Sequence, residues 1–493
     1  MLKSRRASMA HEHFESLEPR QLLASGFNPD GPVVATPSQA PTSIITADFD
    51  GDSKPDLVMS VGREIIFQKG GGGGRFGAPR VLARLNTDAG LLGAGDFNND
   101  GRMDLFSVEK GRLFGWTRAL VNTGEGRFTI TSYSRVQTGV DTLTVGNIDS
   151  DPEPEVLLEG KSPILTLVPG EIPDEVRVLD PQRLFITFGL ESVFPFPALK
   201  FIDRGVAVTG FALAQPALAD LFDTGVNNII IGGRNSDDVQ SGFIQAYAYA
   251  DPNPFIFFPM AGDSAAAPDA PAPLFNPAGG PITLENGVAS VGAADMNNDG
   301  KLDLVATTLQ LLPSTAQFPS LASYEGKTHM FARTGAEGDF EFAAPATLET
   351  RELKGRQGME RVAAPEYRIV TIADLNTDGK PDLGISINQD FYGPRFTFKG
   401  GAREAAFVQL LQPNLYTLPP QTGLFVSSYV SRMFATGLSS EAVLQRTQVF
   451  LASDIRRIGR PDLFIADITN PLGPTEITVR YNVPGRTLVP FLS

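Results

Sequence analysis

One short loop pattern occurs seven times along this chain of 493 residues, each time directly before an apolar segment. In the intact copies an oxygen-bearing side chain occupies loop positions 1, 3, 5 and 9. The four intact copies span residues 48–56, 96–104, 295–303 and 374–382. Three worn copies span residues 147–155, 220–228 and 454–462. A pattern that recurs in this way predicts one supersecondary unit per copy rather than a set of unrelated domains.

The spacing within the loop suits calcium. Calcium takes six to eight oxygen ligands at about 2.3–2.6 Å, and a tight loop that turns alternate side chains inward supplies most of them. We therefore expect about four calcium ions, one in each intact loop. The expected ligand positions, with position 7 contributing its backbone carbonyl, are Asp48, Asp50, Asp52, Lys54, Asp56, Asp96, Asn98, Asp100, Arg102, Asp104, Asp295, Asn297, Asp299, Lys301, Asp303, Asp374, Asn376, Asp378, Lys380 and Asp382.

A glycine at position 6 allows the positive φ that such a turn needs, and three intact loops have one: Gly101, Gly300 and Gly379. The first loop differs, with Ser53 at position 6 and its glycine at Gly51. An EF-hand is excluded because it requires a Glu at position 12 and a helix after the loop. Position 12 is instead Met59, Ser107, Ala306 or Ile385.

The worn loops differ in how much of the pattern they keep. The 147–155 loop retains oxygens throughout and is a candidate fifth site made of Asn147, Asp149, Asp151, Glu153 and Glu155. The other two loops lack the Asp or Asn that the intact loops have at positions 3 and 5. These are now Phe222 and Thr224 in one loop, and Arg456 and Ile458 in the other. Calcium binding by the three worn loops stays open, because Asp, Asn and Gly clusters are also ordinary turn chemistry.

The repeat also predicts the architecture. Between the loops lie segments with the pattern strand, Gly-containing turn, strand, at residues 119–128, 329–342 and 477–488. Seven units of three to four short strands, without a long amphipathic helix, predict an all-β, seven-bladed β-propeller over residues 27–493, with calcium-binding loops between blade strands. A ring must also close its sheet edges. We expect residues 486–491 to pair beside residues 43–47 and close it.

These features together resemble the FG-GAP/VCBS repeat. The resemblance rests on the four intact loops, the Asp-Leu that ends each of them, and the Asn-x-Gly-x-Gly-x-Phe turn at residues 122–128. It covers roughly residues 30–493. That family includes the seven-bladed propeller at the head of integrin α subunits. The resemblance implies calcium at the loop residues already given, with doubt at the three worn loops.

The first 26 residues differ from the rest. Lys3, Arg5 and Arg6 give a basic start, but no apolar run follows, so this is not an ordinary secretory signal. The segment 17–23, Leu-Glu-Pro-Arg-Gln-Leu-Leu, resembles the LEPR-XLL motif at the N-termini of large exported bacterial proteins. We expect residues 1–26 to be a disordered leader and the protein to be secreted or held at the bacterial cell surface.

Composition narrows the function classes. The chain has no cysteine, which excludes disulfides and thiolate chemistry, and a formal charge of −15 argues against a nucleic-acid partner. No apolar stretch is long enough to span a membrane. His329 begins a predicted strand without an identifiable nucleophile. The run Gly70–Gly74 lacks the Lys and helix of a phosphate-binding loop, and instead predicts a hairpin turn.

The expected function is a calcium-binding extracellular propeller that acts as a monomeric cell-surface adhesion module or binds a protein or glycan ligand. We do not expect an enzyme. The alternatives are a polysaccharide lyase, which a cleft of Arg, Lys and Tyr around calcium would favour, and a structural surface component. Two predicted insertions, 251–281 and 349–368, are the places where a recognition loop would sit.

Overall fold

The computed structural model describes residues 26–27, 32–85, 90–109, 115–136, 139–161, 174–184, 198–210, 213–234, 241–249, 275–312, 321–335, 340–357, 362–363, 366–374, 381–391, 403–413, 425–428, 447–467 and 473–483. Within these ranges the chain forms strands and turns and no helix. No helix of the described residues is therefore long and apolar enough to cross a membrane. The predicted leader lies outside these ranges except for Gly26.

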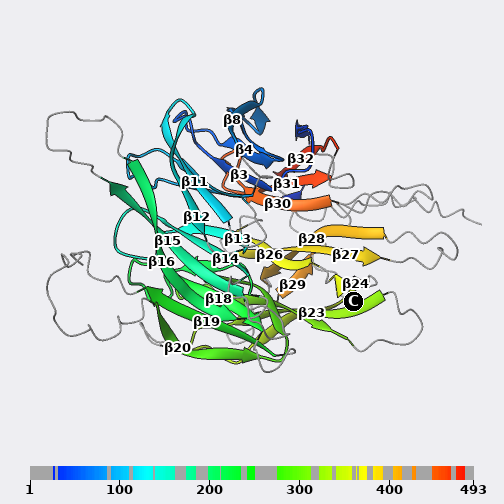
Figure 1. Cartoon of the computed structure of the whole chain (residues 1–493). Helices are drawn as coiled ribbons and strands as arrows, with labels where there is room; N and C mark the ends of the chain where they lie inside the picture. The colour runs from blue at the N-terminus through cyan, green and yellow to red at the C-terminus, as the bar shows by residue number, and fades with distance from the viewer. Residues whose placement is uncertain are drawn as a thin grey trace, which may run out of the picture.

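The strands form six four-stranded antiparallel sheets and one five-stranded sheet, which follow one another around a ring (Figure 1). The colour runs round this ring from blue to red, so that the last sheet lies beside the first. The all-β propeller class is confirmed. Six sheets have the usual four strands of a blade, and the sheet that carries loop 295–303 has a short fifth strand, β25 (Val362–Ala363).

The first three blades are built from β3 (Ser43–Ala47), β4 (Asp56–Val61), β5 (Glu64–Gln68) and β8 (Arg80–Arg84); β9 (Leu91–Gly95), β10 (Asp104–Glu109), β11 (Gly115–Gly124) and β12 (Arg127–Val136); and β13 (Gly139–Gly146), β14 (Glu155–Lys161), β15 (Asp174–Leu184) and β16 (Ala198–Gly210). The next two are β17 (Ala217–Ala219), β18 (Asn228–Arg234), β19 (Gly242–Tyr249) and β20 (Phe275–Leu284); and β21 (Gly287–Ala294), β22 (Asp303–Leu311), β23 (Leu321–Phe331), β24 (Ala346–Gln357) and β25.

The sixth blade consists of β26 (Glu366–Ala373), β27 (Asp382–Phe391), β28 (Arg403–Pro413) and β29 (Phe425–Ser428). The last consists of β30 (Thr447–Ser453), β31 (Asp462–Asp467), β32 (Ile477–Arg480) and the N-terminal strand β2 (Val33–Ala35). Two small ribbons, β1 (Gly26–Phe27) with β33 (Asn482–Val483) and β6 (Gly70–Gly72) with β7 (Arg75–Phe76), complete the described strands.

All seven predicted loops occupy the same place in their blades. Each begins directly after the first strand, and its position 9 is the first residue of the second strand. Position 2 is apolar and buried in every described copy: Phe49, Phe97, Ile148, Leu221, Met296 and Ile455. Phe49, for example, packs with Leu92, Leu105 and Leu120 of the following blade. The loop is thereby anchored in the core between two blades.

The first strands surround the ring axis and are linked by polar contacts between blades. The backbone N–H of Leu92 in β9 donates to Ser43 Oγ in β3 at 3.2 Å. That of Ile369 in β26 donates to Ser290 Oγ in β21 at 2.9 Å. The first and last blades meet in the same way, where Thr46 Oγ1 donates to Ser453 Oγ at 2.6 Å. These short first strands therefore act as one inner wall.

The ring closes through the N-terminal strand. β2 pairs with β32, placing Val33 opposite Thr478, so the last blade takes its outermost strand from the start of the chain. The segment 486–491, which we predicted to close the ring, lies outside the described residues. Among the described strands, β3 (residues 43–47) pairs with β4 only, so the predicted pairing with residues 486–491 is not tested. The described closure joins an early and a late strand in the last blade.

Other local predictions have mixed outcomes. The hairpin at 119–128 is formed by β11 and β12. The Gly70–Gly74 run forms the turn between β6 and β7, with left-handed backbone at Gly72, Gly73 and Gly74. The predicted insertion at 349–368 is wrong in its described part, because β24 and β25 occupy much of it as blade strands. Most of the insertion at 251–281 lies outside the described residues.

Candidate metal sites

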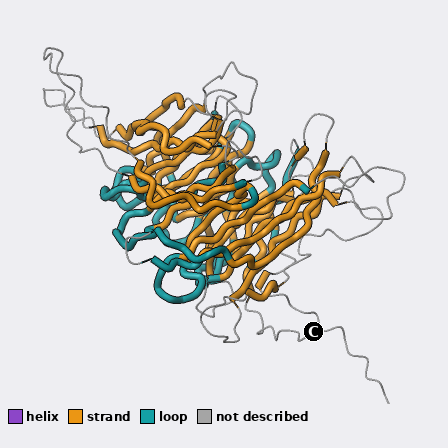
Figure 2. Tube along the Cα trace, turned by 90° about the horizontal axis from the view of Figure 1, so that it is seen from below, coloured by secondary structure: helices purple, strands orange, loops and turns teal. Residues whose placement is uncertain are grey.

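The loops gather along one side of the strand ring (Figure 2). Five of them share the same turn, with left-handed backbone at positions 4 and 6. Position 6 is Gly101 in the second loop and Gly300 in the fifth, with φ of 81° and 86°. In the first loop Ser53 itself takes this conformation, with φ of 66°, and Gly51 takes position 4 with φ of 81°. The predicted turn is therefore present, and Ser53 follows it without a glycine.

The position-1 carboxylate fixes this turn by accepting backbone N–H groups. Asp96 accepts from Asp100 at 2.9 Å and from Gly101 at 2.8 Å. The matching bonds to Asp295 are 3.0 and 2.8 Å long. The worn loop at 220–228 keeps the pair, because Asp220 accepts from Thr224 and Gly225 at 2.9 and 2.6 Å. The turn is thus encoded by one Asp and does not by itself identify a metal site.

The position-9 side chain lies under the loop and joins it to the third strand. Asp56 accepts from the N–H of Phe49 at 2.9 Å and from that of Gly70 at 2.6 Å. A side chain at Gly70 would not fit, because its Cβ would lie 2.1 Å from the Pro55 carbonyl oxygen. Burial raises the pKa of Asp56 to about 6, and it raises those of Asp104 and Asp303 to about 7 and about 6. These carboxylates are electrostatically strained when no cation is near.

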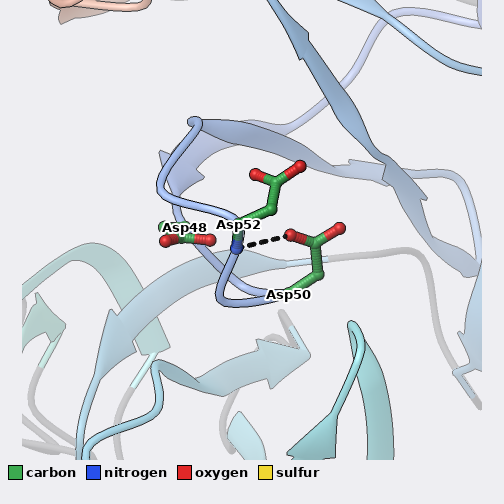
Figure 3. Close-up of side chains that lie close together, drawn as sticks. All are labelled: Asp48, Asp50 and Asp52. Atoms are coloured by element: carbon green, nitrogen blue, oxygen red, sulfur yellow. Dashed lines mark hydrogen bonds between the residues drawn. The ribbon is translucent and has the colours of Figure 1, made fainter.

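The first loop brings three carboxylates together (Figure 3). Oxygens of Asp48, Asp50 and Asp52 all lie within 4.8 Å of one another. One Asp50 oxygen accepts from the N–H of Asp52 at 3.1 Å. The ammonium of Lys69 lies against Asp50 and is 3.1 Å from an Asp52 oxygen, and Lys54 is also 3.1 Å from Asp52. Although burial acts to raise it, these hydrogen bonds from Lys54 and Lys69 lower the pKa of Asp52 to about 2.

The second and fifth loops hold an amide and a carboxylate at positions 3 and 5. Asn98 Nδ2 donates to Asp100 Oδ2 at 3.1 Å, and Asn297 Nδ2 to Asp299 Oδ2 at 3.0 Å. The guanidinium of Arg102 is 2.6 Å from the same oxygen of Asp100. In the sixth loop only Asp374, Pro381 and the buried Asp382 are described, so the predicted ligands Asn376, Asp378 and Lys380 lie outside the described residues.

The worn loop at 147–155 has an acidic cluster of its own. Oxygens of Asp149, Asp151 and Glu155 lie within 4.8 Å of one another. Glu155 is fully buried, and burial raises its pKa to about 8. None of the left-handed residues of the other loops occurs here, where Ser150 and Pro152 stand at positions 4 and 6. The candidate fifth site is therefore acidic but differs in backbone from the intact loops.

The last loop contains its own cation. Arg456, at position 3, directs its guanidinium at the buried position-9 carboxylate of Asp462, with N–O distances of 3.1 and 2.9 Å. It also donates to the Asn482 carbonyl at 2.5 Å and lies over the Tyr481 ring, 4.6 Å from its centroid. The turn itself is retained, since Asp454 accepts from Ile458 and Gly459. A guanidinium thus stands where the intact loops carry a ligand for a cation.

Side chains also bridge neighbouring loops. Asn122 Nδ2 donates to the Phe49 carbonyl in the first loop at 2.6 Å. Asn227 Nδ2 donates to the Asn147 carbonyl at 2.7 Å, and Arg457 donates to the Ser53 carbonyl across the ring closure. These bridges tie the first loop to the second and last blades, and the third loop to the fourth.

Calcium fits the donor set of the first loop. The trio Asp48, Asp50 and Asp52 offers hard oxygens at a spacing that one ion can span, and calcium prefers such ligands. Asp56 lies beneath with both oxygens already bonded to backbone, so it supports the loop as well as offering charge. In the second and fifth loops the described side chains also supply the expected oxygen types. Bound calcium would there supply the positive charge that offsets the clustered carboxylates.

Two other features bear on catalysis. His329 is buried between Thr308 and Thr347, with ring N–O distances of 3.2 and 3.4 Å, and burial lowers its pKa, as in a packed core residue. A cavity of about 750 Å³ is lined by first-strand residues of several blades, including Thr142, Ser290 and Arg368. Arg368 is the one ionisable residue among the described lining residues, so these residues do not supply the Arg, Lys and Tyr combination expected of a lyase.

Comparison with known proteins adds little to this description. No protein-family model matches the chain, and no curated protein matches it. Among solved structures, it is similar to a lectin of Agrocybe aegerita, described as specifically recognising non-reducing terminal N-acetylglucosamine. The two are 13% identical, the TM-score is 0.37, and the match covers 74% of this chain and 80% of the lectin.

Proposed function

We propose that this chain is a calcium-binding extracellular β-propeller of the FG-GAP/VCBS kind, which acts as a ligand-binding or adhesion module at the bacterial cell surface. The observation that carries the proposal is the oxygen trio of Asp48, Asp50 and Asp52 in a loop whose turn recurs around the ring. The second and fifth loops, which keep this turn and place an amide and a carboxylate at positions 3 and 5, support a cation-binding design that extends beyond the first blade.

Calcium would have a structural role in this design. Each intact loop concentrates carboxylates, and like charges held together oppose the folded state. Extracellular calcium modules bind with dissociation constants of about 10⁻⁴–10⁻³ M. At ten times the dissociation constant each occupied site would add about 1.4 kcal/mol of stability. Millimolar calcium would therefore favour the folded ring outside the cell, where the leader motif at 17–23 is proposed to send it.

The ligand is proposed to be a surface protein or glycan. Two described features support a binding role: the loops bridged by Asn122, Asn227 and Arg457, and the cavity near the axis. A cavity of this volume lies in the usual range for small-molecule and sugar-sized sites. No catalytic constellation supports an enzyme in the described residues, and the polysaccharide lyase and the purely structural protein remain alternatives.

The decisive experiment has two steps. Calorimetric titration of the chelated chain with calcium, together with thermal melting, should give about four ions and a clear rise in melting temperature. An absence of calcium binding would overturn the proposal. A glycan array beside a lyase assay then separates the ligand-binding module from the enzyme, with Arg368→Ala as the cavity variant and exposed Arg63→Ala as its control. Silence in both assays favours the structural role.

A further inference from the structure

The worn loop at 147–155 contains a buried carboxylate oxygen that the fold does not use. Glu155 is 0% exposed, and its Oε2 accepts from the N–H of Ile148 at 2.7 Å. Its Oε1 is buried and has no hydrogen-bond partner. A buried oxygen of this kind is costly, because it has lost water without gaining a donor. Within the described residues no donor or cation satisfies this oxygen, and a bound cation would do so.

The matching residue is bonded differently in the first and fifth loops, although Asp104 of the second loop also has a buried oxygen, Oδ2, without a hydrogen bond. Both oxygens of Asp56 accept backbone N–H groups, and so do both oxygens of Asp303, from Met296 and from Arg333 in the third-strand region. Glu155 is one methylene longer than these Asp residues. It keeps the bond to the loop backbone and still brings an oxygen within 4.8 Å of Asp149 and Asp151. The longer side chain thus joins an oxygen cluster that Asp56 does not join in the first loop.

The third strand brings a positive side chain to the loop in the first blade and a negative one in the third blade. In the first blade Leu57 pairs with Gln68, so the next residue, Lys69, faces Asp56, and its ammonium meets Asp50 and Asp52. In the third blade Val156 pairs with Leu179, so the register places Asp180 opposite Glu155. Asp180 is 3% exposed and interacts electrostatically with both Asp151 and Glu155. The first loop therefore has a built-in competitor for a cation, whereas the third gains an acid.

We infer that the 147–155 loop is a calcium site, in which Asp149, Asp151 and Glu155 Oε1 are ligands and Asp180 on β15 adds attraction. The site binds calcium more tightly than the 48–56 loop, although the latter has the fuller motif, because Lys69 must be displaced there. The inference deepens the proposed function and rests on it only for the identity of the ion. The 147–155 loop, which keeps less of the motif, is thus expected to have the higher calcium affinity of the two.

Variants of the full chain test this, with bound calcium counted by native mass spectrometry across a calcium titration of chelated protein. Glu155→Gln keeps an oxygen for Ile148 and should lose one ion from the wild-type count. Asp180→Asn should keep the count but weaken one site by about tenfold or more. Asp141→Asn, which also removes one negative charge but at an exposed position, is the control and should change neither the ion count nor the affinity. Lys69→Met should tighten a different site.

Each outcome has one meaning. A wild-type chain that binds no calcium overturns the proposed function, whereas a calcium-binding chain whose ion count survives Glu155→Gln overturns this inference alone. Should Glu155→Gln fail to fold, Asp151→Asn gives the same count, because position 5 is Asp in every intact loop and the amide oxygen can still accept from the N–H of Glu153. Melting in chelator gives a second readout: Glu155→Gln should melt higher than wild type, and a lower melting temperature would contradict a repulsive acidic cluster.

Discussion

Arg456 and Asp462 form a two-point ion pair inside the last loop, with guanidinium–carboxylate distances of 3.1 and 2.9 Å. The carboxylate is fully buried and the arginine side chain is 20% exposed. Burial raises the pKa of Asp462 and the arginine opposes this rise. In the blade that closes the ring, the buried position-9 carboxylate is therefore neutralised by a side chain of its own loop.

Removing this arginine should destabilise the protein strongly. Arg456→Ala leaves a buried carboxylate without its partner, and we expect a loss of about 3 kcal/mol in the free energy of unfolding. The loss should be the same in chelator and in calcium. Denaturant unfolding in both buffers measures it, with exposed Arg63→Ala, outside this loop, as the control. A loss that disappears in calcium would mean that the ion, and not the arginine, neutralises this loop.

The same loop should accept a calcium ion when its side chains are restored. The double variant Arg456→Asn, Ile458→Asp places oxygens at positions 3 and 5 of a turn that already has the intact backbone form at Arg457 and Gly459. We expect one more bound ion than in wild type, counted by native mass spectrometry. Ile458→Asp alone retains the guanidinium and should add none. An unchanged count in the double variant would contradict the replacement of a cation by Arg456.

A matched pair of variants separates the turn from the metal. Asp96 and Asp220 accept equivalent backbone bonds, but only the Asp96 loop has oxygens at positions 3 and 5. In chelator, Asp96→Asn and Asp220→Asn should each cost about 1–2 kcal/mol, because one acceptor is lost. In calcium at ten times the dissociation constant, Asp96→Asn alone should lose about 1.4 kcal/mol more. If Asp96→Asn loses the same free energy of unfolding in both buffers, the second loop does not bind calcium.

The acidic cluster of the third blade predicts a pH dependence in chelator. The pKa of Glu155 is raised from 4.5 in the unfolded chain to about 8 in the folded one. A raised pKa favours the protonated folded state, so its contribution is complete below pH 4.5 and is lost as the pH rises through 8. Wild type should therefore lose on the order of 3 kcal/mol relative to Glu155→Gln between pH 5 and pH 9. Parallel pH profiles of the two proteins would contradict this.

The pairing that closes the ring can be made covalent. Val33 and Thr478 are opposite one another in β2 and β32, and facing residues of antiparallel strands lie within disulfide range. Because the chain has no cysteine, Val33→Cys with Thr478→Cys has only one partner choice. Oxidation should stabilise the protein by about 3–5 kcal/mol. Melting before and after reduction measures the change, and either single variant is the control.

Much of the fold could be predicted because the loop pattern is itself structural. Its position 9 begins the second strand of each blade, its position 2 enters the core, and its spacing therefore marks every blade. Closure by β2 could not be predicted, because a strand of three residues carries no recognisable period. The charged sequence of the outer strand β24 predicts an insertion, because exposed Thr350 and Glu352 beside buried Leu353 give no clear apolar alternation.

Site residues that lie close together in the sequence could be predicted, whereas those that strand pairing brings to the loop could not. The oxygens of the first loop follow one another within a few residues, so their spacing indicates their chemistry. Lys69 and Asp180 act on their loops from a neighbouring strand, and only the strand register brings them there. Arg456 lies within the loop, where it departs from the pattern at position 3. Its role as a cation could not be inferred until its distance to Asp462 was known.

The pairing of β2 with β32 has a consequence for biosynthesis. The strands of the other six blades lie between β2 and β32 in the sequence, so β2 is translated long before its partner exists. Blades built from consecutive segments can form while the chain is still growing, but the last blade cannot be completed until β32 has been made. Contacts between such distant segments are slow to form. The blade that contains β2 should therefore be the last to form, and a chain cut before β32 would leave the edge of β2 open.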